Sequence, residues 1–106
     1  MEYTVKCVPK TDVSLNQAVY RLLNQEGIQK DENLEYTCAI LDENGNPIAT
    51  GSCFGNTLRC IAVDHHYQGK GFLNLLILHL TEYQLTRGNT HLFLYTKTDE
   101  IGRAHV

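Results

Sequence analysis

The chain has 106 residues with a hydrophobic content of 42%, a charged content of 20% and a formal net charge of −3. This balance fits one small domain with one core, excludes a disordered chain and gives no sign of a nucleic-acid-binding surface. The most apolar run, Phe72 to Leu80, is too short to cross a bilayer, and the N-terminus has no signal-peptide core, so we expect a cytoplasmic protein.

A short strand and an amphipathic helix open the chain. The segment "EYTVKCV", residues 2–8, alternates polar and apolar side chains and is followed by a proline, which indicates a strand. Residues 11–29 repeat apolar side chains at helical spacing, with Asp12 or Ser14 as the expected N-cap and Gly27 as the expected stop. The predicted apolar stripe of this helix consists of Val13, Leu15, Ala18, Val19, Leu22 and Leu23.

Three strands joined by tight turns are predicted next, over residues 34–41, 48–54 and 57–63. Asn44-Gly45 is a strong hairpin signal because both residue types tolerate positive φ, and Gly55-Asn56 is a second tight turn. The three strands should therefore form an antiparallel meander. The first of them is expected to place on one face the side chains of Leu34, Tyr36, Cys38 and Ile40.

A helix and a last strand complete the predicted elements. The helix runs from about Gly71 to Arg87 and is apolar almost all round, which indicates that it is covered on several sides. The segment "THLFLYT", residues 90–96, is a fifth strand, parallel to or splayed from the strand at 57–63. We therefore expect an α/β (α+β) fold with a mixed, mostly antiparallel sheet flanked by helices.

The cysteine and histidine patterns give no metal-binding signature. The four cysteines, at positions 7, 38, 53 and 60, form no C-x-x-C pair, so we expect four buried thiols in a reducing compartment. His65 and His66 are adjacent in one loop with only Asp64 beside them, which argues against a metal role. His79 and His91 lie among apolar residues and are expected to be core or interface histidines. We predict no metal site.

The stretch "VDHHYQGKGF", residues 63–72, leads from a strand into a helix and carries a candidate anion site. Glycines at the start of a helix let an anion approach the free N–H groups of the first turn, where the helix dipole is positive. Gln68 can add a hydrogen bond and Lys70 a charge, so the loop suits phosphate or pyrophosphate. It matches neither a P-loop nor a dinucleotide-binding fingerprint. A plain turn into the helix is the alternative.

The loop resembles the main motif of the GNAT acetyltransferase superfamily, Q/R-x-x-G-x-G/A. The motif maps onto residues 68–73, where Gln68 and Gly71 match and Leu73 stands in place of Gly or Ala. The resemblance implies a GNAT-like fold in which loop and helix N–H groups bind the pyrophosphate of coenzyme A and the preceding strand pairs with its pantetheine arm. The cofactor-binding residues that it implies are Ile61, Ala62, Val63, Gln68, Gly69, Lys70, Gly71 and Leu73.

Three segments resemble the N-terminal GNAT-like domain of the citrate lyase ligase family, namely "ATGSCFGN" (49–56), "LRCIAV" (58–63) and "THLFLYTK" (90–97). That family acetylates the prosthetic-group thiol of the citrate lyase acyl carrier protein with ATP and acetate. The resemblance implies coenzyme A, acetyl-CoA or a phosphopantetheine-type arm as the cofactor. ATP would act only through a C-terminal nucleotidyltransferase domain, whose H-x-G-H-type motif is not among these residues. The expected partners are that domain and the carrier protein, with no nucleic acid and no membrane.

The expected domain is a C-terminally truncated GNAT-like acyl-CoA-binding domain over residues 1–100. The segment "IGRAHV", residues 101–106, resembles a translated sequencing adapter and is predicted to be a non-native tail. We expect the fragment to be inactive alone, and its catalytic residues stay unassigned. One alternative is a stand-alone N-acetyltransferase that uses acetyl-CoA, although the strand at 57–63 carries no carboxylate to act as a base. A non-catalytic binding module is the other alternative.

Overall fold

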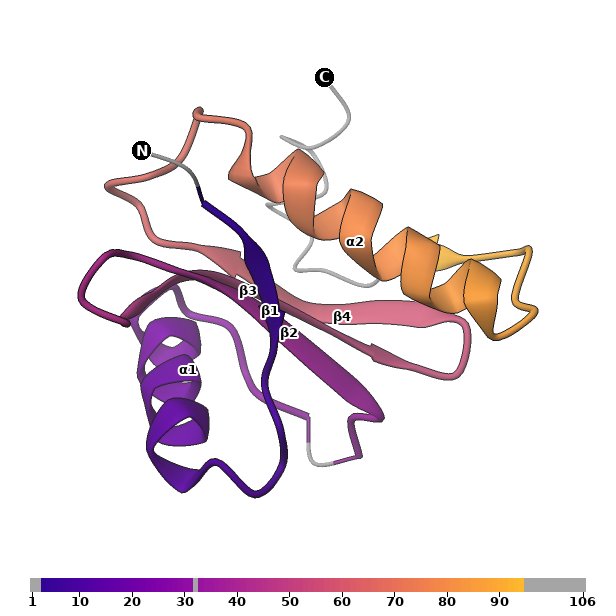
Figure 1. The fold of residues 1–106 in the computed structure, drawn as a ribbon, viewed down its shortest axis with the longest axis horizontal. Helices are drawn as coiled ribbons and strands as arrows, with labels where there is room; N and C mark the ends of the chain where they lie inside the picture. The colour runs from indigo at the N-terminus through magenta and orange to yellow at the C-terminus, as the bar shows by residue number, and fades with distance from the viewer. Residues whose placement is uncertain (1–2, 32, 95–106) are drawn as a thin grey trace.

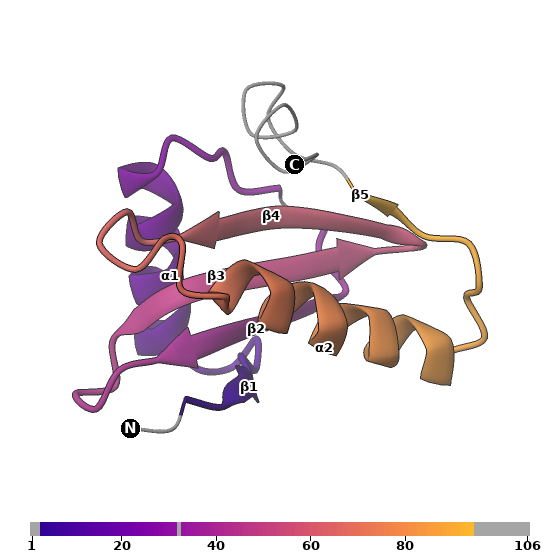
Figure 2. The same ribbon diagram turned by 90° about the horizontal axis from the view of Figure 1, so that it is seen from above.

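A computed structural model of the chain describes residues 3–31 and 33–94, which form a five-stranded sheet between two helices (Figure 1). The elements are β1 (Val5–Cys7), α1 (Val13–Gln25), β2 (Tyr36–Leu41), β3 (Pro47–Phe54), β4 (Thr57–Val63), α2 (Phe72–Thr86) and β5 (Phe93–Leu94). The strands lie side by side in chain order, antiparallel except for the parallel pair β4–β5. The view from above shows that α1 and α2 cover opposite faces of the sheet (Figure 2).

The predicted mixed, mostly antiparallel sheet is confirmed, including the β2–β4 meander and the parallel fifth strand. The register of the parallel pair places Phe93 and Leu94 beside Thr57 and Leu58. The rest of the predicted fifth strand and the predicted tail at 101–106 lie outside the described residues. Within the described part of the chain, neither helix is long and apolar enough to cross a membrane.

The first helix, α1, begins and ends where the local sequence predicts. The Asp12 carboxylate accepts a hydrogen bond from the N–H of Leu15 at 3.0 Å, and Gly27 follows the helix with a φ of +74°. Its buried side chains are Val19, Leu22 and Leu23. The assignment of Val13 to the buried stripe is wrong, because this first residue of the helix is 65% exposed and the buried side begins further along.

The second helix, α2, covers the other face through the fully buried side chains of Leu76 and Leu80. Gly51 of β3 allows this close approach, because a Cβ at that position would lie 2.9 Å from Leu80 Cδ1. The sheet residues under α2 are Cys38, Ile40, Ile48, Ala49, Cys53, Leu58 and Ile61. On the outer side Leu78 is 56% exposed and Leu85 is exposed as well, so the described residues do not cover α2 on all sides.

The expectation of four buried thiols is correct for three of them. Cys38, Cys53 and Cys60 are buried, but Cys7 is exposed. Cys7 is the last residue of a three-residue strand at the edge of the sheet. An edge strand has no neighbour on its outer side, so burial there depends on what covers it.

Two further side chains lie in surroundings that differ from those predicted. Leu34 precedes β2, where strand alternation does not apply, and it packs in the cluster on the α1 face rather than with Cys38 on the α2 face. His91 is exposed, so a core position is wrong for it, and the alternative of an interface histidine stays a prediction. His79 is half-buried as expected, with its Nε2 atom 2.7 Å from the hydroxyl of Tyr36.

Candidate functional site

A β-bulge bends β4 near its end. The register of β3 with β4 leaves Gly51 opposite both Cys60 and Ile61. Cys60 has a φ of +52°, an uncommon conformation for a residue that carries a side chain. The Cys60 side chain lies in the cluster on the α1 face, and that of Ile61 lies in the cluster on the α2 face. The bulge therefore includes Ile61, the first residue of the stretch 61–63 for which pairing with a pantetheine arm is predicted.

The backbone of Val63 directs its polar groups away from β3. The N–H of Asp64 points toward β3 and donates to the carbonyl of Ile48 at 2.8 Å. Backbone groups of successive residues in an antiparallel strand point in alternate directions, so the N–H and carbonyl of Val63 point away from β3. The side chain of Gln68 donates from Nε2 to the Val63 carbonyl at 3.1 Å. Among the described residues, β5 pairs only with the first two residues of β4. Among the described residues no strand pairs with the edge of β4 at 61–63, although the Val63 carbonyl already accepts from Gln68.

The glycines of the loop between β4 and α2 are required by backbone conformation. Gly69 and Gly71 have φ values of +79° and +87°, in the left-handed region that disfavours side chains. A Cβ at either position would meet no other atom within 4 Å, so packing does not explain these glycines. Lys70 lies between them, with its Nζ atom 5.8 Å from the centre of the Tyr67 ring. The loop therefore presents one lysine beside two bends that only glycine adopts readily.

The start of α2 leaves its first backbone donors without a side-chain cap. Gly71 is the N-cap and supplies no side-chain hydrogen bond. The first residue that donates back to it is Leu75, whose N–H lies 3.1 Å from the Gly71 carbonyl. The preceding N–H groups of the first turn have no intrahelical partner, and the helix dipole is positive here. Leu73, in the same turn, is 36% exposed. This arrangement suits an anionic group of a ligand.

The end of α1 forms hydrogen bonds with the first residues of the loop between β4 and α2. Glu26 accepts a hydrogen bond from the N–H of His65 at 3.1 Å, and its Oε2 atom lies 2.9 Å from His65 Nδ1. Gln25 donates from Nε2 to Asp64 Oδ2 at 3.1 Å. Asp64 Oδ1 accepts from the N–H of His66 at 2.8 Å and lies 3.1 Å from its Nδ1 atom. Two histidines and two carboxylates therefore meet where the loop contacts α1.

Hydrogen bonds lower the pKa values of the Glu26 and Asp64 carboxylates. Partial burial opposes ionisation of Glu26, but hydrogen bonds from His65 and Gln25 outweigh it and hold the pKa below its ordinary value. Partial burial also opposes ionisation of Asp64, and hydrogen bonds from His66 and Gln25 lower its pKa in the same way. The hydrogen bond with Glu26 raises the pKa of His65. Both carboxylates are therefore ionised at neutral pH.

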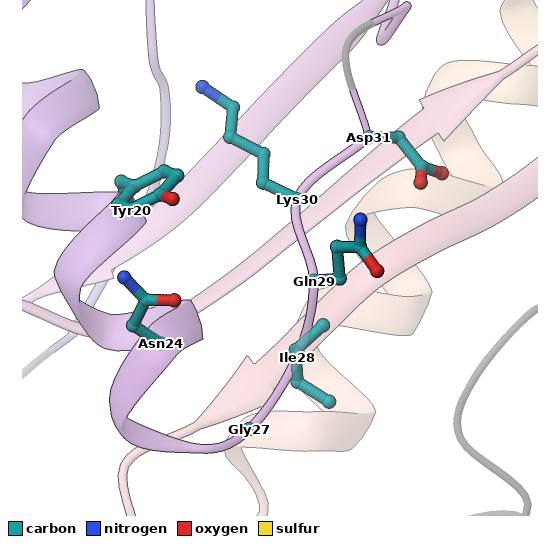
Figure 3. Close-up of a pocket in the computed structure, with 7 residues that line it drawn as sticks. All are labelled: Tyr20, Asn24, Gly27, Ile28, Gln29, Lys30 and Asp31. Carbon is teal, nitrogen blue, oxygen red and sulfur yellow. The ribbon is translucent and has the colours of Figure 1, made fainter.

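A surface cavity of about 710 Å³ lies between α1 and the extended segment that follows it (Figure 3). Its described lining consists of Tyr20, Asn24, Gly27, Ile28, Gln29, Lys30 and Asp31, none of which belongs to the glycine loop. The segment is fixed to β4, because Asp31 pairs with Arg59 at 2.9 Å and its N–H lies 3.4 Å from Cys60 Sγ. No sequence motif marked this cavity, since its two walls are placed by tertiary contacts.

The eight predicted cofactor-binding residues fall into two adjoining groups. Ile61, Ala62 and Val63 end β4, and the loop and first turn of α2 carry Gln68, Gly69, Lys70, Gly71 and Leu73. The Gln68–Val63 hydrogen bond joins the two groups. Sequence reasoning did not identify Gln25 and Glu26, because nothing in the chain indicates that the end of α1 contacts a loop almost forty residues later.

Comparison with protein families and curated proteins gives consistent results. A model of the acetyltransferase (GNAT) family matches residues 6–106. The chain is 31% identical over 81 residues to the [citrate [pro-3S]-lyase] ligase of Haemophilus influenzae, covering 76% of this chain and 24% of that protein. It is 28% identical over 81 residues to the same ligase of Escherichia coli, covering 76% of this chain and 23% of that protein. The chain thus spans about a quarter of the length of these relatives.

Solved structures with the same fold include several acetyltransferases. An aminoglycoside acetyltransferase from an uncultured soil metagenomic sample superposes with a TM-score of 0.79 at 13% identity, covering 97% of this chain and 83% of that one. N-acetylglutamate synthase from Neisseria gonorrhoeae, solved with coenzyme A and N-acetyl-glutamate, has a TM-score of 0.72 at 19% identity, covering 99% of this chain and 28% of that one. At these identities the likeness concerns the fold.

Proposed function

Because this chain belongs to the acetyltransferase (GNAT) family, we propose that its glycine loop and the start of α2 bind the pyrophosphate of coenzyme A or acetyl-CoA. The observation that carries the proposal is the uncapped first turn of α2 behind two left-handed glycines, Gly69 and Gly71. Backbone N–H groups at a positive helix end bind phosphate oxygens, and Lys70 adds a charge beside them.

The same proposal gives β4 a role. The edge of β4 at 61–63 begins at the bulge and leads directly to the loop. The amide groups of a pantetheine arm can pair with outward-facing backbone groups of that edge, as an added strand would. Gln68 supports this geometry because it ties the loop to the Val63 carbonyl at 3.1 Å. The arm and the pyrophosphate would then lie in line, along β4 and across the start of α2.

Calorimetry with three ligands tests the loop. Coenzyme A and dephospho-coenzyme A both carry the pyrophosphate and should bind with similar affinity, whereas pantetheine lacks it and should bind more than tenfold more weakly. Equal binding of pantetheine would remove the loop from the proposal. Replacing Lys70 with Ala should weaken the binding of coenzyme A more than that of pantetheine, because only coenzyme A carries the negative pyrophosphate that the lysine would contact.

A matched pair of glycine variants separates ligand effects from folding effects. Gly71→Val introduces a β-branched side chain at a φ of +87° beside the proposed anion, and it should abolish measurable binding of coenzyme A. Gly88→Val introduces the same residue at a φ of +85° beyond the opposite end of α2, so it strains the backbone similarly but should leave binding unchanged in the folded fraction. Equal loss of binding in both variants would contradict the proposed site.

We further propose that the chain supplies the coenzyme A- or phosphopantetheine-binding part of a protein of the citrate lyase ligase type. The proposal is supported by the 31% identity with the Haemophilus influenzae ligase, of which the chain spans 24%. The resemblance implies transfer of acetate, activated by ATP, to the thiol on an acyl carrier protein, with the ATP step in parts of the relatives that this chain does not span. The chain should therefore bind a carrier bearing phosphopantetheine more tightly than the unmodified carrier, and equal binding would contradict this role.

A stand-alone N-acetyltransferase is the second candidate. One observation favours it: the chain covers 83% of a solved aminoglycoside acetyltransferase of the same fold. Thiol release from acetyl-CoA in the presence of a panel of amines distinguishes the two proposals. Turnover with any amine supports the second candidate, whereas carrier binding without amine turnover supports the first.

A further inference from the structure

Four metal-ligating side chains converge where α1 meets the loop after β4. We call Glu26, Asp64, His65 and His66 the histidine–carboxylate cluster. The atoms His65 Nδ1 and Glu26 Oε2 are 2.9 Å apart, and His66 Nδ1 and Asp64 Oδ1 are 3.1 Å apart. His65 Nδ1 also lies 3.9 Å from Asp64 Oδ1. The ligand atoms of Asp64, His65 and His66 all lie within 4.8 Å of one another.

The sequence argued against a metal at this loop because only Asp64 stands beside the two histidines. The fold removes that objection, since the end of α1 adds Glu26 as a second carboxylate at hydrogen-bond distance from His65. Two imidazoles and two carboxylates make a complete ligand set for a first-row transition metal. A ligand contributed by a distant part of the chain also gives the site a fixed frame, because α1 and β4 are both anchored to the sheet core.

We propose that the histidine–carboxylate cluster binds one divalent transition-metal ion of the Zn²⁺ class through His65 Nδ1, His66 Nδ1 and one oxygen each from Asp64 and Glu26. A tetrahedral site with bonds of about 2.0–2.1 Å places its ligand atoms roughly 3.3 Å apart. The separations of 2.9, 3.1 and 3.9 Å lie on both sides of that value. Closing the site around an ion requires the exposed imidazoles of His65 and His66 to rotate toward the two less exposed carboxylates.

The charge and the donor types of the cluster suit such an ion. Two carboxylates balance the charge of a divalent cation. The imidazole rings of His65 and His66 have side-chain exposures of 56% and 75%, so each can keep its proton on Nε2 in contact with water while Nδ1 binds metal. Magnesium and calcium prefer all-oxygen ligand sets, so this mixed set favours zinc, nickel, cobalt or copper.

Gln25 acts as a positioning residue for the ligands. Its Nε2 atom donates to Asp64 Oδ2 at 3.1 Å and to Glu26 Oε2 at 2.8 Å. Asp64 Oδ1, the oxygen nearest His66 Nδ1, is not engaged by this amide, but it accepts from the His66 backbone N–H at 2.8 Å. The Gln25 Nε2 atom also lies 3.4 Å from His65 Nδ1, so it is close to three of the proposed ligands. Hydrogen bonds of this kind orient metal ligands, and their loss commonly weakens metal affinity by about 10–100-fold.

Metal titration of the full chain, carrying no affinity tag, tests the site. Calorimetry with Zn²⁺ should give one ion per chain, and Co²⁺ should produce the intense visible absorption of a tetrahedral complex that Zn²⁺ then displaces. Mg²⁺ should not compete. The His65→Ala, His66→Ala and Glu26→Gln variants should each lose more than tenfold in affinity, and Gln25→Ala should lose about tenfold.

Two controls keep the test decisive. His91→Ala removes an exposed histidine outside the cluster and should leave affinity unchanged. Circular dichroism of each metal-free variant checks that the fold is retained, and Glu26→Gln changes one charge at nearly constant shape. Wild-type affinity no greater than that of the His65→Ala/His66→Ala double variant, or full affinity in Glu26→Gln, would overturn the proposal. The result does not depend on coenzyme A, so it stands or falls separately from the proposed function.

Discussion

The two helices lie on opposite faces of one sheet, but they begin differently (Figure 2). The first turn of α1 is capped by its own chain, since the Asp12 carboxylate accepts from the N–H of Leu15 at 3.0 Å. The first turn of α2 follows Gly71, which supplies no side-chain hydrogen bond. A glycine at the N-cap costs only about a few tenths of a kcal/mol relative to a capping side chain. The first donors of α1 are therefore partly met by its own chain, whereas those of α2 lack a side-chain cap, as the proposed anion site requires.

The helices also differ in how they use their apolar residues. The helix α1 is amphipathic and buries one apolar stripe. The helix α2 is apolar almost all round but buries only one row of side chains, and Leu78 on its outer side is 56% exposed. The buried row of α2 approaches the sheet closely over Gly51. The helix with the open N-terminus is therefore held firmly by its other contacts, and this keeps its first turn in place.

The largest expected effect tests the packing of α2 against the sheet. Leu80→Ala should lower the free energy of unfolding by about 2–5 kcal/mol, because it empties a fully buried position under α2. Leu78→Ala, two residues away on the exposed side, should change it by less than about 0.5 kcal/mol. Urea denaturation measures both. Similar losses in the two variants would show that the outer side of α2 is also covered.

A smaller effect is expected at the glycine beneath α2. Gly51→Ala places a Cβ 2.9 Å from Leu80 Cδ1 and should cost about 1–3 kcal/mol through overpacking. The double variant Gly51→Ala/Leu80→Ala should be more stable than the sum of the two single changes predicts, because each removes the clash or cavity made by the other. Strict additivity in the unfolding free energies would place the two residues out of contact.

Removing the cap of α1 tests the comparison of the two helix starts. Asp12→Ala should lower stability by about 1 kcal/mol, because the N–H of Leu15 loses its acceptor. It should leave the affinity for coenzyme A unchanged, in contrast to Gly71→Val at the start of α2. Thermal melting and calorimetry on the same samples provide the two measurements. A change in coenzyme A affinity in Asp12→Ala would mean that the two helix starts are not independent.

Local signals explain what could be predicted from the sequence. Asp12 and Gly27 each lie within a few residues of the end of α1 that they mark, and the turns between β2, β3 and β4 depend on adjacent residues. The glycine loop could likewise be recognised from six consecutive residues, and the predicted likeness to the GNAT and citrate lyase ligase families is confirmed by the comparisons. The assignment of coenzyme A-binding residues stays a prediction.

Features that depend on distant contacts could not be predicted. The sequence predicts a buried Cys7 because an unpaired cysteine in a strand is commonly buried, but the local sequence does not reveal that a short edge strand lacks cover. The bulge at Cys60 depends on the register of β4 against β3, which no single segment contains. The contact between Glu26 and His65 requires α1 and the loop to be placed together by the sheet. The metal proposal rests on the contact between Glu26 and His65, and the account of the β4 edge rests on the register of β4.

The last expected effect appears only in alkaline solution and concerns the thiols under α2. Burial raises the pKa of Cys38 from 9.0 to about 12 and that of Cys53 from 9.0 to about 11, so the folded state disfavours both thiolates. Stability from these groups is fully present below pH 9 and is lost as the pH rises above it, by about 1 kcal/mol at pH 10 for Cys38. Urea denaturation at pH 8 and pH 10 should show this loss, and Cys38→Ala should reduce it. Iodoacetamide at pH 8 should modify exposed Cys7 well before the buried thiols, and equal labelling of Cys38 would show that α2 does not stay closed over the sheet.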